Sequence, residues 1–178
     1  MAAYSKPFVR TQNLKIDGVE VTATAAELNA AATGALTPMV TLTGDTTLVA
    51  ATHAGKTLLL GEVGGNAALA ATLPAATGSG AKYRFVVSVV NTSGYTIQVT
   101  TTDIMQGSIL STNDSGTGIG WLAGATADTI ILDGTTKGGV SIGDFIECED
   151  ILDATWMVSG VTNSSGAEAT PFSAAVGA

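Results

Sequence analysis

The sequence has few charged residues. Asp, Glu, Lys and Arg together make up 12% of the 178 residues, whereas soluble domains usually contain about a quarter. Hydrophobic residues make up 46%. A monomer needs a well-charged surface to stay in solution. The composition therefore predicts that part of the surface is covered by other chains.

Cysteine and histidine are nearly absent. Cys148 is the only cysteine, which excludes an intrachain disulfide, and its strand-like surroundings predict a buried small hydrophobe. His53 is the only histidine, and no Gly-x-Ser-x-Gly elbow accompanies it for a catalytic triad. A zinc site needs three or four protein ligands, and one His and one Cys provide only two of the usual kinds. We expect a turn histidine, no metal and no cofactor.

Long apolar stretches are also missing. The sequence contains no run of about 18 apolar residues, which is the length that a membrane-spanning helix needs. The first residues, MAAYSKPFVR, lack the apolar stretch of a signal peptide, which predicts production in a cytoplasm. The net charge of −8 argues against a nucleic-acid partner, which would favour a basic face.

The positive charge gathers at the N-terminus. Three of the seven cations precede the first acid, Asp17, and the other four are set against fifteen acids, a net charge of −11. Aromatic side chains alternate with these first cations, which favours an arm lying along another protein surface; a solvated tail is the alternative. The arm residues expected to contact the other protein surface are Tyr4, Lys6, Phe8, Arg10 and Lys15.

One short helix is predicted in the stretch TATAAELNAAATG, residues 22–34. Thr24 and Glu27 have the spacing of a capping box, and Gly34 provides a stop. About two turns are too few for a stable isolated helix. We expect the helix, with Leu28 on its apolar face, to act as an elbow between the arm and the following domain and to pack on another surface. Residues 1–35 form the arm and helix in this interpretation.

Residues 36–162 show strand patterns separated by Gly, Asn and Asp turns. KYRFVVSVV (82–90) alternates, with Tyr83, Phe85, Val87 and Val89 on one face. The turn NTSG then predicts a hairpin whose return strand is YTIQVT. GDFIECEDILDATWMVSGV (143–161) predicts two strands joined by a polar link over 149–155. The whole is typical of an all-β protein: a single β-sandwich or jelly-roll-like domain, followed by a C-terminal tail over 163–178.

Two stretches imitate catalytic or binding sites. AATHAGKT (50–57) fits a relaxed phosphate loop, but its first glycine is missing and no helical pattern follows. We interpret Gly55-Lys56 as a turn that enters a strand. Five acids cluster between Asp144 and Asp153. Such acids could cleave glycosides or bind calcium. However, alternation puts Glu147 and Glu149 on the face opposite Ile146 and Cys148, which favours a solvated strand face.

The two tryptophans have different surroundings. Trp156 shares a strand face with Val158, which predicts a core position. Trp121 lies in GTGIGWLAG, a glycine-rich stretch predicted to be a loop. It would either plug one end of the sandwich or contact another subunit, and the sequence leaves both interpretations open.

Several of these stretches together resemble structural proteins of tailed bacteriophages. VTATAAELNAAATG resembles a Thr-Ala-x-Glu-Leu-Asn segment that often joins an N-terminal arm to a β domain. KTLLLGEVGGNAALAATLPAATGSGAKYRFVV and DTIILDGTTKGGVSIGDFIECEDILDATWMVSGV are similar to the strands of phage head decoration, or cement, proteins, as is the tail ATPFS. The Trp hairpin differs, because EDILDATW stands where relatives commonly have a short Asp-Gly or Asn-Gly turn.

The resemblance implies a virion protein, not an enzyme, with neither cofactor nor small-molecule substrate. Such a protein binds the major capsid protein on the outer surface of the shell, usually as a homotrimer at three-fold positions, and stabilises the shell. A tail-fibre or other receptor-binding virion protein is the alternative, although aromatic residues make up only 5%. A glycan hydrolase that uses the Asp144 to Asp153 cluster is a third, weaker hypothesis.

Overall fold

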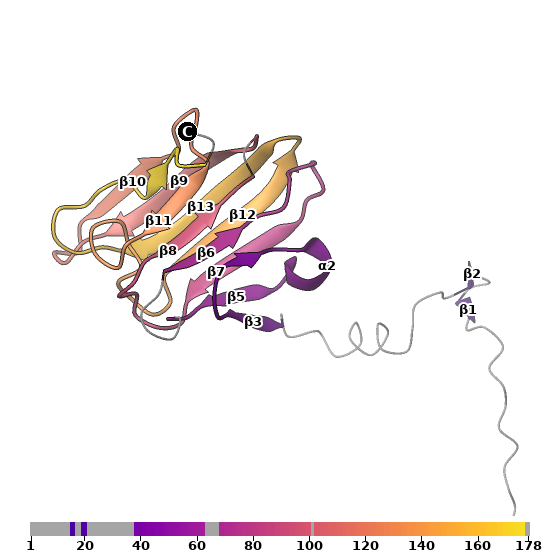
Figure 1. The fold of residues 1–178 in the computed structure, drawn as a ribbon, viewed down its shortest axis with the longest axis horizontal. Helices are drawn as coiled ribbons and strands as arrows, with labels where there is room; N and C mark the ends of the chain where they lie inside the picture. Colours follow the sequence, from indigo (N-terminus) through magenta and orange to yellow (C-terminus); the bar gives the residue numbers. More distant parts are fainter. Residues whose placement is uncertain (1–14, 17–18, 21–37, 63–67, 101, 177–178) are drawn as a thin grey trace, which may run out of the picture. The chain divides into compact units, whose positions relative to one another are not determined.

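The computed structural model describes residues 15–16, 19–20, 38–62, 68–100 and 102–176 (Figure 1). The chain divides into two units, residues 1–36 and 37–178. In the first unit, β1 (Lys15–Ile16) and β2 (Val19–Glu20) form an antiparallel pair. The helix predicted to begin near Thr24 lies outside the described residues.

The second unit contains two mixed β-sheets, which confirms the prediction of an all-β, sandwich-like domain. The larger sheet contains, in spatial order, β10 (Gly118–Leu122), β9 (Ile104–Thr112), β13 (Thr155–Asn163), β12 (Phe145–Leu152), β7 (Lys82–Val87), β5 (Thr57–Leu60) and β3 (Met39–Leu42). The smaller sheet contains β14 (Phe172–Ser173), β11 (Thr129–Leu132), β8 (Tyr95–Gln98), β6 (Leu69–Thr72) and β4 (Thr46–Thr47).

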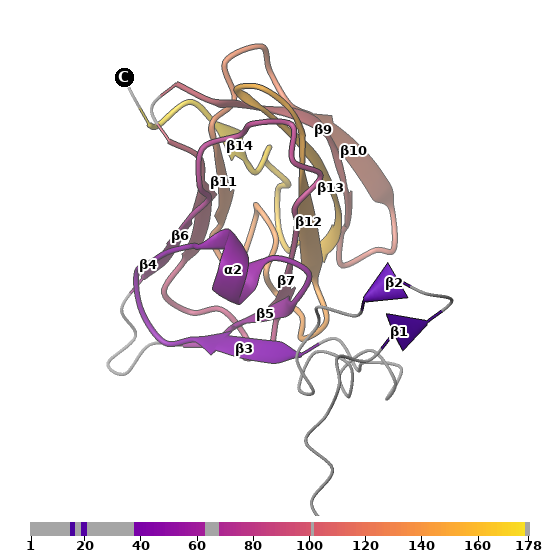
Figure 2. The same ribbon diagram turned by 90° about the vertical axis from the view of Figure 1, so that its right-hand side faces the viewer.

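The chain winds between the two sheets as a coil. From β3 to β8 successive strands alternate between the larger and the smaller sheet (Figure 2). Consequently β3, β5 and β7 pair in parallel in one sheet, and β4, β6 and β8 pair in parallel in the other. A later parallel pair, β9 with β13, runs for nine residues beside the antiparallel β12–β13 hairpin.

This winding corrects the predicted hairpin between residues 82 and 100. The stretch NTSG is a turn, in which the side-chain oxygen of Asn91 accepts hydrogen bonds from the backbone N–H groups of Ser93 and Gly94. However, β7 and β8 belong to different sheets. The Asn91 amide also donates to the carbonyl of Leu132 at 2.6 Å, so the turn sends the chain across the sandwich instead of back along β7.

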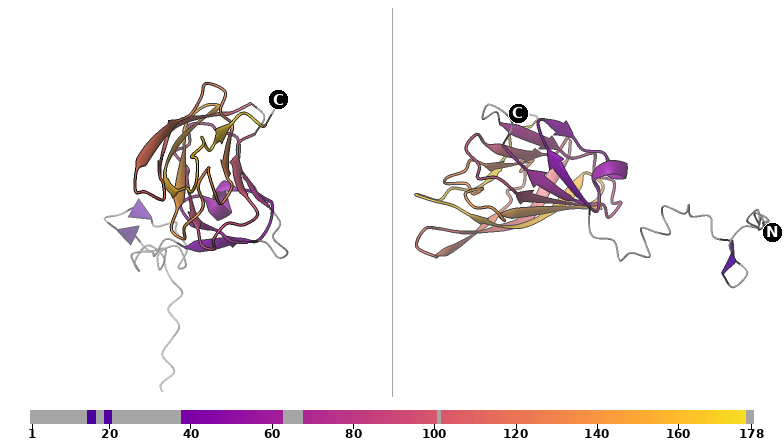
Figure 3. Two further views of the ribbon diagram at one scale, coloured as in Figure 1. Left: turned by 90° about the vertical axis from the view of Figure 1, so that its left-hand side faces the viewer. Right: turned by 90° about the horizontal axis from the view of Figure 1, so that it is seen from below.

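The two sheets face each other (Figure 3), and buried side chains from both form the hydrophobic core. The predicted alternation in β7 is confirmed for Tyr83, Phe85 and Val87, which are fully buried. Val89 lies beyond the strand and is exposed, so its predicted position is wrong. Trp156 is also fully buried, as predicted, and meets Tyr83 edge to face with ring centroids 5.6 Å apart. This geometry adds to the burial of two large rings.

The stretch that imitates a phosphate loop is a turn before a strand. A four-residue helix that the sequence analysis did not predict, α2 (Ala50–His53), precedes it. Gly55 has a φ of 68° and its N–H donates to the carbonyl of Lys82. The chain then enters β5 at Thr57. The interpretation of Gly55-Lys56 as a turn entering a strand is therefore confirmed.

The β12–β13 hairpin is tighter than the sequence indicated. The polar link predicted over residues 149–155 is wrong, because β12 continues to Leu152 and β13 begins at Thr155. Two residues, Asp153 and Ala154, join the strands. Ala154 has a φ of 56°, a left-handed conformation that glycine adopts more easily. Asp-Ala thus occupies the place of an Asp-Gly turn.

Replacing Ala154 with glycine should stabilise the protein. The left-handed conformation costs a non-glycine residue about 1–2 kcal/mol, and the greater freedom of glycine in the unfolded chain offsets part of the gain. We expect the free energy of unfolding in urea to rise by about 0.5–1 kcal/mol. Ala51→Gly, in the exposed middle of α2, is the control and should lower it. A fall with Ala154→Gly would contradict the turn geometry.

Candidate functional site

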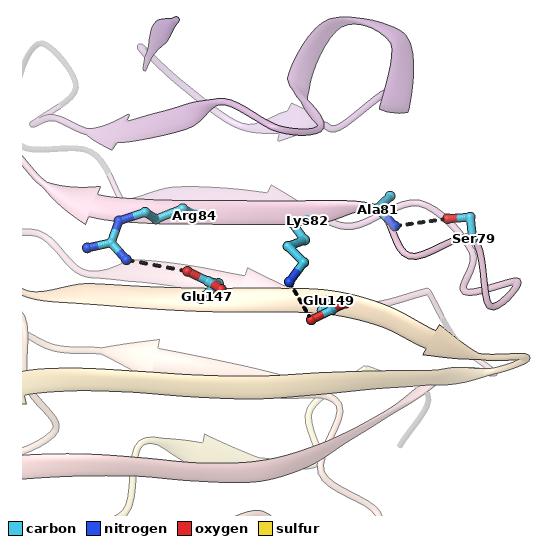
Figure 4. A network of polar contacts seen from close by, with 6 residues as sticks. All are labelled: Ser79, Ala81, Lys82, Arg84, Glu147 and Glu149. Atoms are coloured by element: carbon cyan, nitrogen blue, oxygen red, sulfur yellow. Dashed lines mark hydrogen bonds and ion pairs between the residues drawn. The ribbon is translucent and has the colours of Figure 1, made fainter. Parts of the chain in front are cut away.

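The outer face of the larger sheet carries two neighbouring ion pairs. Lys82 and Arg84 point outward from β7, and Glu149 and Glu147 stand opposite them on β12 (Figure 4). Lys82 Nζ lies 3.0 Å from Glu149 Oε2, and Arg84 lies 3.4 Å from Glu147 Oε2. The hydrogen bond to Glu149 raises the pKa of Lys82. The prediction that Glu147 and Glu149 lie on a solvated strand face is confirmed.

An apolar row crosses the same face beside the ion pairs. The strand registers place five residues side by side, in the order Leu110, Val161, Phe145, Val86 and Leu59. Neighbours of this kind lie about 5 Å apart, so the side chains form a continuous strip, which we call the apolar stripe. Leu110 is 49% exposed and Val161 is 40% exposed. The Arg84 guanidinium stacks 4.1 Å from the centre of the Phe145 ring.

A hollow borders the stripe on the β5 side. It is lined by Gly55, Lys56, Thr57, Lys82, Arg84 and Glu147, with a volume of about 400 Å³. The hollow thus contains three of the four cations in residues 37–178. This part of the surface is free of excess negative charge, although the unit as a whole is acidic.

Two other acids of the Asp144 to Asp153 cluster are buried, so the solvated face holds only part of the cluster. Asp150 is 2% exposed and Asp144 is 4% exposed. Both are on the core side of the sheet, and each fixes a turn. Each of these carboxylates accepts several hydrogen bonds from the protein itself, so its role is to hold the structure together.

Asp150 holds the loop that precedes β7. Its carboxylate accepts hydrogen bonds from the backbone N–H groups of Thr77, Gly78 and Ser79, at 2.7–3.1 Å, and from the Ser79 hydroxyl at 2.6 Å. Burial alone would raise the pKa of Asp150, but these hydrogen bonds outweigh it and lower the pKa to about 2. The carboxylate is therefore ionised at neutral pH.

Asp144 joins the start of β12 to the end of β13. It accepts hydrogen bonds from the N–H groups of Gly139 and Ser141 and from both the backbone and the side-chain amide of Asn163. Burial raises the pKa of Asp144 in spite of these bonds. Asp128 has a similar role at the C-terminal end, where it accepts from the N–H groups of Ala175 and Val176. The carboxylates thus hold the C-terminal residues and the loops against the sheets.

Trp121 lies in a strand, so the prediction of a loop around it is wrong. It belongs to β10, opposite Ile109 of β9, and packs half-buried against the core. Its indole N–H is buried and has no hydrogen-bond partner among the described residues. β10 is an edge strand of the larger sheet. A contact between Trp121 and another subunit stays a prediction.

Most of the predicted contact residues of the arm and helix elbow lie outside the described part of the chain. These residues are Tyr4, Lys6, Phe8, Arg10, Thr24, Glu27 and Leu28. Lys15 is in β1, opposite Glu20 in register.

The remaining reactive side chains have structural surroundings. Cys148 is buried as predicted, and burial raises the pKa of its thiol. His53 ends α2, where its Nδ1 lies 2.9 Å from the backbone N of Val49. Within the described ranges, no group of three or more His, Cys, Asp or Glu side chains could hold a metal ion. No helix in the described residues is long and apolar enough to span a bilayer.

Sequence reasoning missed the apolar stripe. Each of its residues occupies an outward position on a different strand, from β9 to β5. Within each strand the alternation predicts which residues share a face, but only the register between distant strands aligns them.

No family model, curated protein or solved structure matches this chain.

Proposed function

We propose that this chain is a structural protein of a tailed-phage virion that binds the major capsid protein on the outer surface of the shell. It acts as a homotrimer at three-fold positions and stabilises the shell as a cement protein. The sequence resemblance to head decoration proteins is the origin of this proposal. Assembly onto the capsid takes place in the host cytoplasm.

The observation that carries the proposal is the structural role of the buried carboxylates in residues 37–178. Two carboxylates of the candidate catalytic cluster, Asp150 and Asp144, instead fix loops and strand ends, and Asp128 acts in the same way outside the cluster. A cement protein has to transmit force between its contacts without changing shape. Turns held by buried charge-assisted hydrogen bonds are suited to that task, because such bonds are about twice as strong as neutral ones.

The exposed apolar stripe is the second support. Contiguous apolar surface on a soluble protein marks an interaction site, and this chain has little charge with which to stay monomeric. The described body therefore has the properties of an assembly component. The acidic side chains elsewhere and the basic arm provide complementary charges for contacts between subunits or with the shell.

Electron microscopy of virions tests this proposal. Particles of the phage that encodes this sequence would be imaged with a gold-labelled antibody against residues 37–178. We expect label on the head, and density at lattice three-fold positions in a reconstruction of the same particles. Label confined to the tail would overturn the cement function and favour the tail-fibre or receptor-binding alternative. Particles without label would overturn a virion role.

A further inference from the structure

We propose that the apolar stripe on the outer face of the larger sheet is the surface through which copies of this chain associate. The inference rests on the proposed function, which requires self-association, and it names the surface that provides it. Leu110, Val161, Phe145, Val86 and Leu59 form the stripe, with the two ion pairs of β7 and β12 along its border.

The exposure of the stripe shows that it is available for contact. Leu110 and Val161, on neighbouring strands, are about half exposed. Met157 and Leu122, which point outward from β13 and β10, are 37% and 79% exposed on the same face. Leu122 extends the apolar surface diagonally from Leu110 to the β10 edge, whereas Met157 is flanked in register by Gln106 and Glu149. Interfaces between copies of one chain are more apolar than the average protein surface.

The distribution of charge identifies a second copy as the occupant. Residues 37–178 contain four cations and twelve acids. The ion pairs place two charges of each sign on this face, where they neutralise one another, and Lys56 adds one cation at its border, so a net charge of −9 belongs to the rest of the unit. Two copies that approach through any acidic surface repel each other. Approach through the stripe brings together faces that carry almost no net charge and buries apolar surface on both sides.

The ion pairs also define the border of the contact. Lys82 and Arg84 are held by Glu149 and Glu147 of their own chain. They therefore need no charged partner from a second copy. A strongly basic or acidic partner would have to break these pairs in order to use the face. An uncharged surface, such as the stripes of the other two copies where all three meet around a three-fold axis, can cover the stripe while the pairs stay at its solvated rim.

The test is the mass of stripe variants in solution. Size-exclusion chromatography with light scattering would be applied to the full chain, to Val161→Glu and to the control Val90→Glu. Val90 is 47% exposed but lies beyond the end of β7, outside the sheet. We expect a trimer for the wild type and for Val90→Glu, and at least a 100-fold weaker association for Val161→Glu, because the new carboxylate would lose its water in the interface.

A second variant guards against misfolding. Leu110→Ser shortens an exposed side chain without adding charge and should weaken association at least tenfold. The near-ultraviolet circular dichroism of Trp156 and Tyr83, both buried, reports whether each variant is folded. A folded variant of either kind that remains fully trimeric overturns the proposal, and so does a monomeric wild type.

Capsid binding is measured separately with the same proteins. If Val161→Glu stays trimeric but no longer sediments with capsids, the stripe faces the shell and the proposal is wrong. If the wild type is a trimer that depends on the stripe but is located on the tail, the inference holds and the cement function fails. The two proposals can therefore fail independently.

Discussion

Replacing Asp150 with asparagine should lower the free energy of unfolding at pH 7 by about 3 kcal/mol. The wild-type carboxylate accepts bonds from three backbone N–H groups and the Ser79 hydroxyl while almost fully buried. Asparagine has one acceptor oxygen and turns an N–H₂ group toward donors. Hydrogen bonds to a buried charge contribute about 1.5–3 kcal/mol each, and donors left unpaired add a penalty.

Urea denaturation with and without the substitution provides the measurement, and Asp114→Asn is the control. Asp114 is exposed in the loop between β9 and β10, so its change should stay within about 0.5 kcal/mol. An equal effect of the two substitutions would contradict the role assigned to Asp150.

The effect of Asp150 should also depend on pH. Its pKa is lowered in the folded state to about 2 from 3.8, so its contribution is present above pH 4 and is lost as the pH falls through 2. One pKa unit corresponds to about 1.4 kcal/mol, which makes this contribution about 2 kcal/mol. The stability difference between wild type and Asp150→Asn should shrink by that amount in acid. Taking the difference cancels Asp144, whose raised pKa acts in the opposite direction.

Gly107→Ala should be the most damaging single substitution considered, with a loss of about 3–5 kcal/mol or failure to fold. Gly107 lies in β9 with a φ of 133°. A Cβ atom there would come within 1.9 Å of the carbonyl oxygen of Val158, in the backbone of the paired strand β13. The strands would have to separate, which adds the cost of overpacking to that of an unfavourable backbone conformation.

Gly116→Ala separates these two costs. Gly116 also has a positive φ, 76°, but no atom lies within 4 Å of the position its Cβ would take. Its substitution should cost only about 1–2 kcal/mol. Thermal and urea unfolding of the two variants provide the comparison. Equal losses would show that the close approach of β9 and β13 does not limit stability.

The sequence predicted the residues that face the core better than it predicted their neighbours in space. Alternation in β7 and β12 correctly marked Tyr83, Phe85 and Cys148 as buried, because a strand with one face in the core follows a period of two. The hairpin after β7 was wrong because a turn sequence fixes the turn and not the strand that follows. Asn91 makes the predicted turn, but its bond to Leu132 directs the chain to the other sheet.

The candidate surface could be predicted only in part. Alternation placed Glu147 and Glu149 outward and puts Asp144 and Asp150 on the face of Ile146 and Cys148. It could not predict the partners that make burial of the two carboxylates possible, since these come from loops up to 73 residues away. Likewise, the stripe depends on the pairing of Val161 with Leu110 across the parallel β9–β13 ladder. A local pattern contains no information on such a register.

The winding of the chain between the two sheets determines how the protein can fold. Because β3 to β8 alternate between sheets, neither sheet can be completed while the other is missing, and no half of the body has a finished core. β9 must also wait for β13, since their paired residues Ile104 and Thr155 are 51 positions apart. Pairings of such high contact order make folding slow, on the scale of milliseconds to seconds. Folding of residues 37–178 therefore finishes only after nearly all of them have left the ribosome.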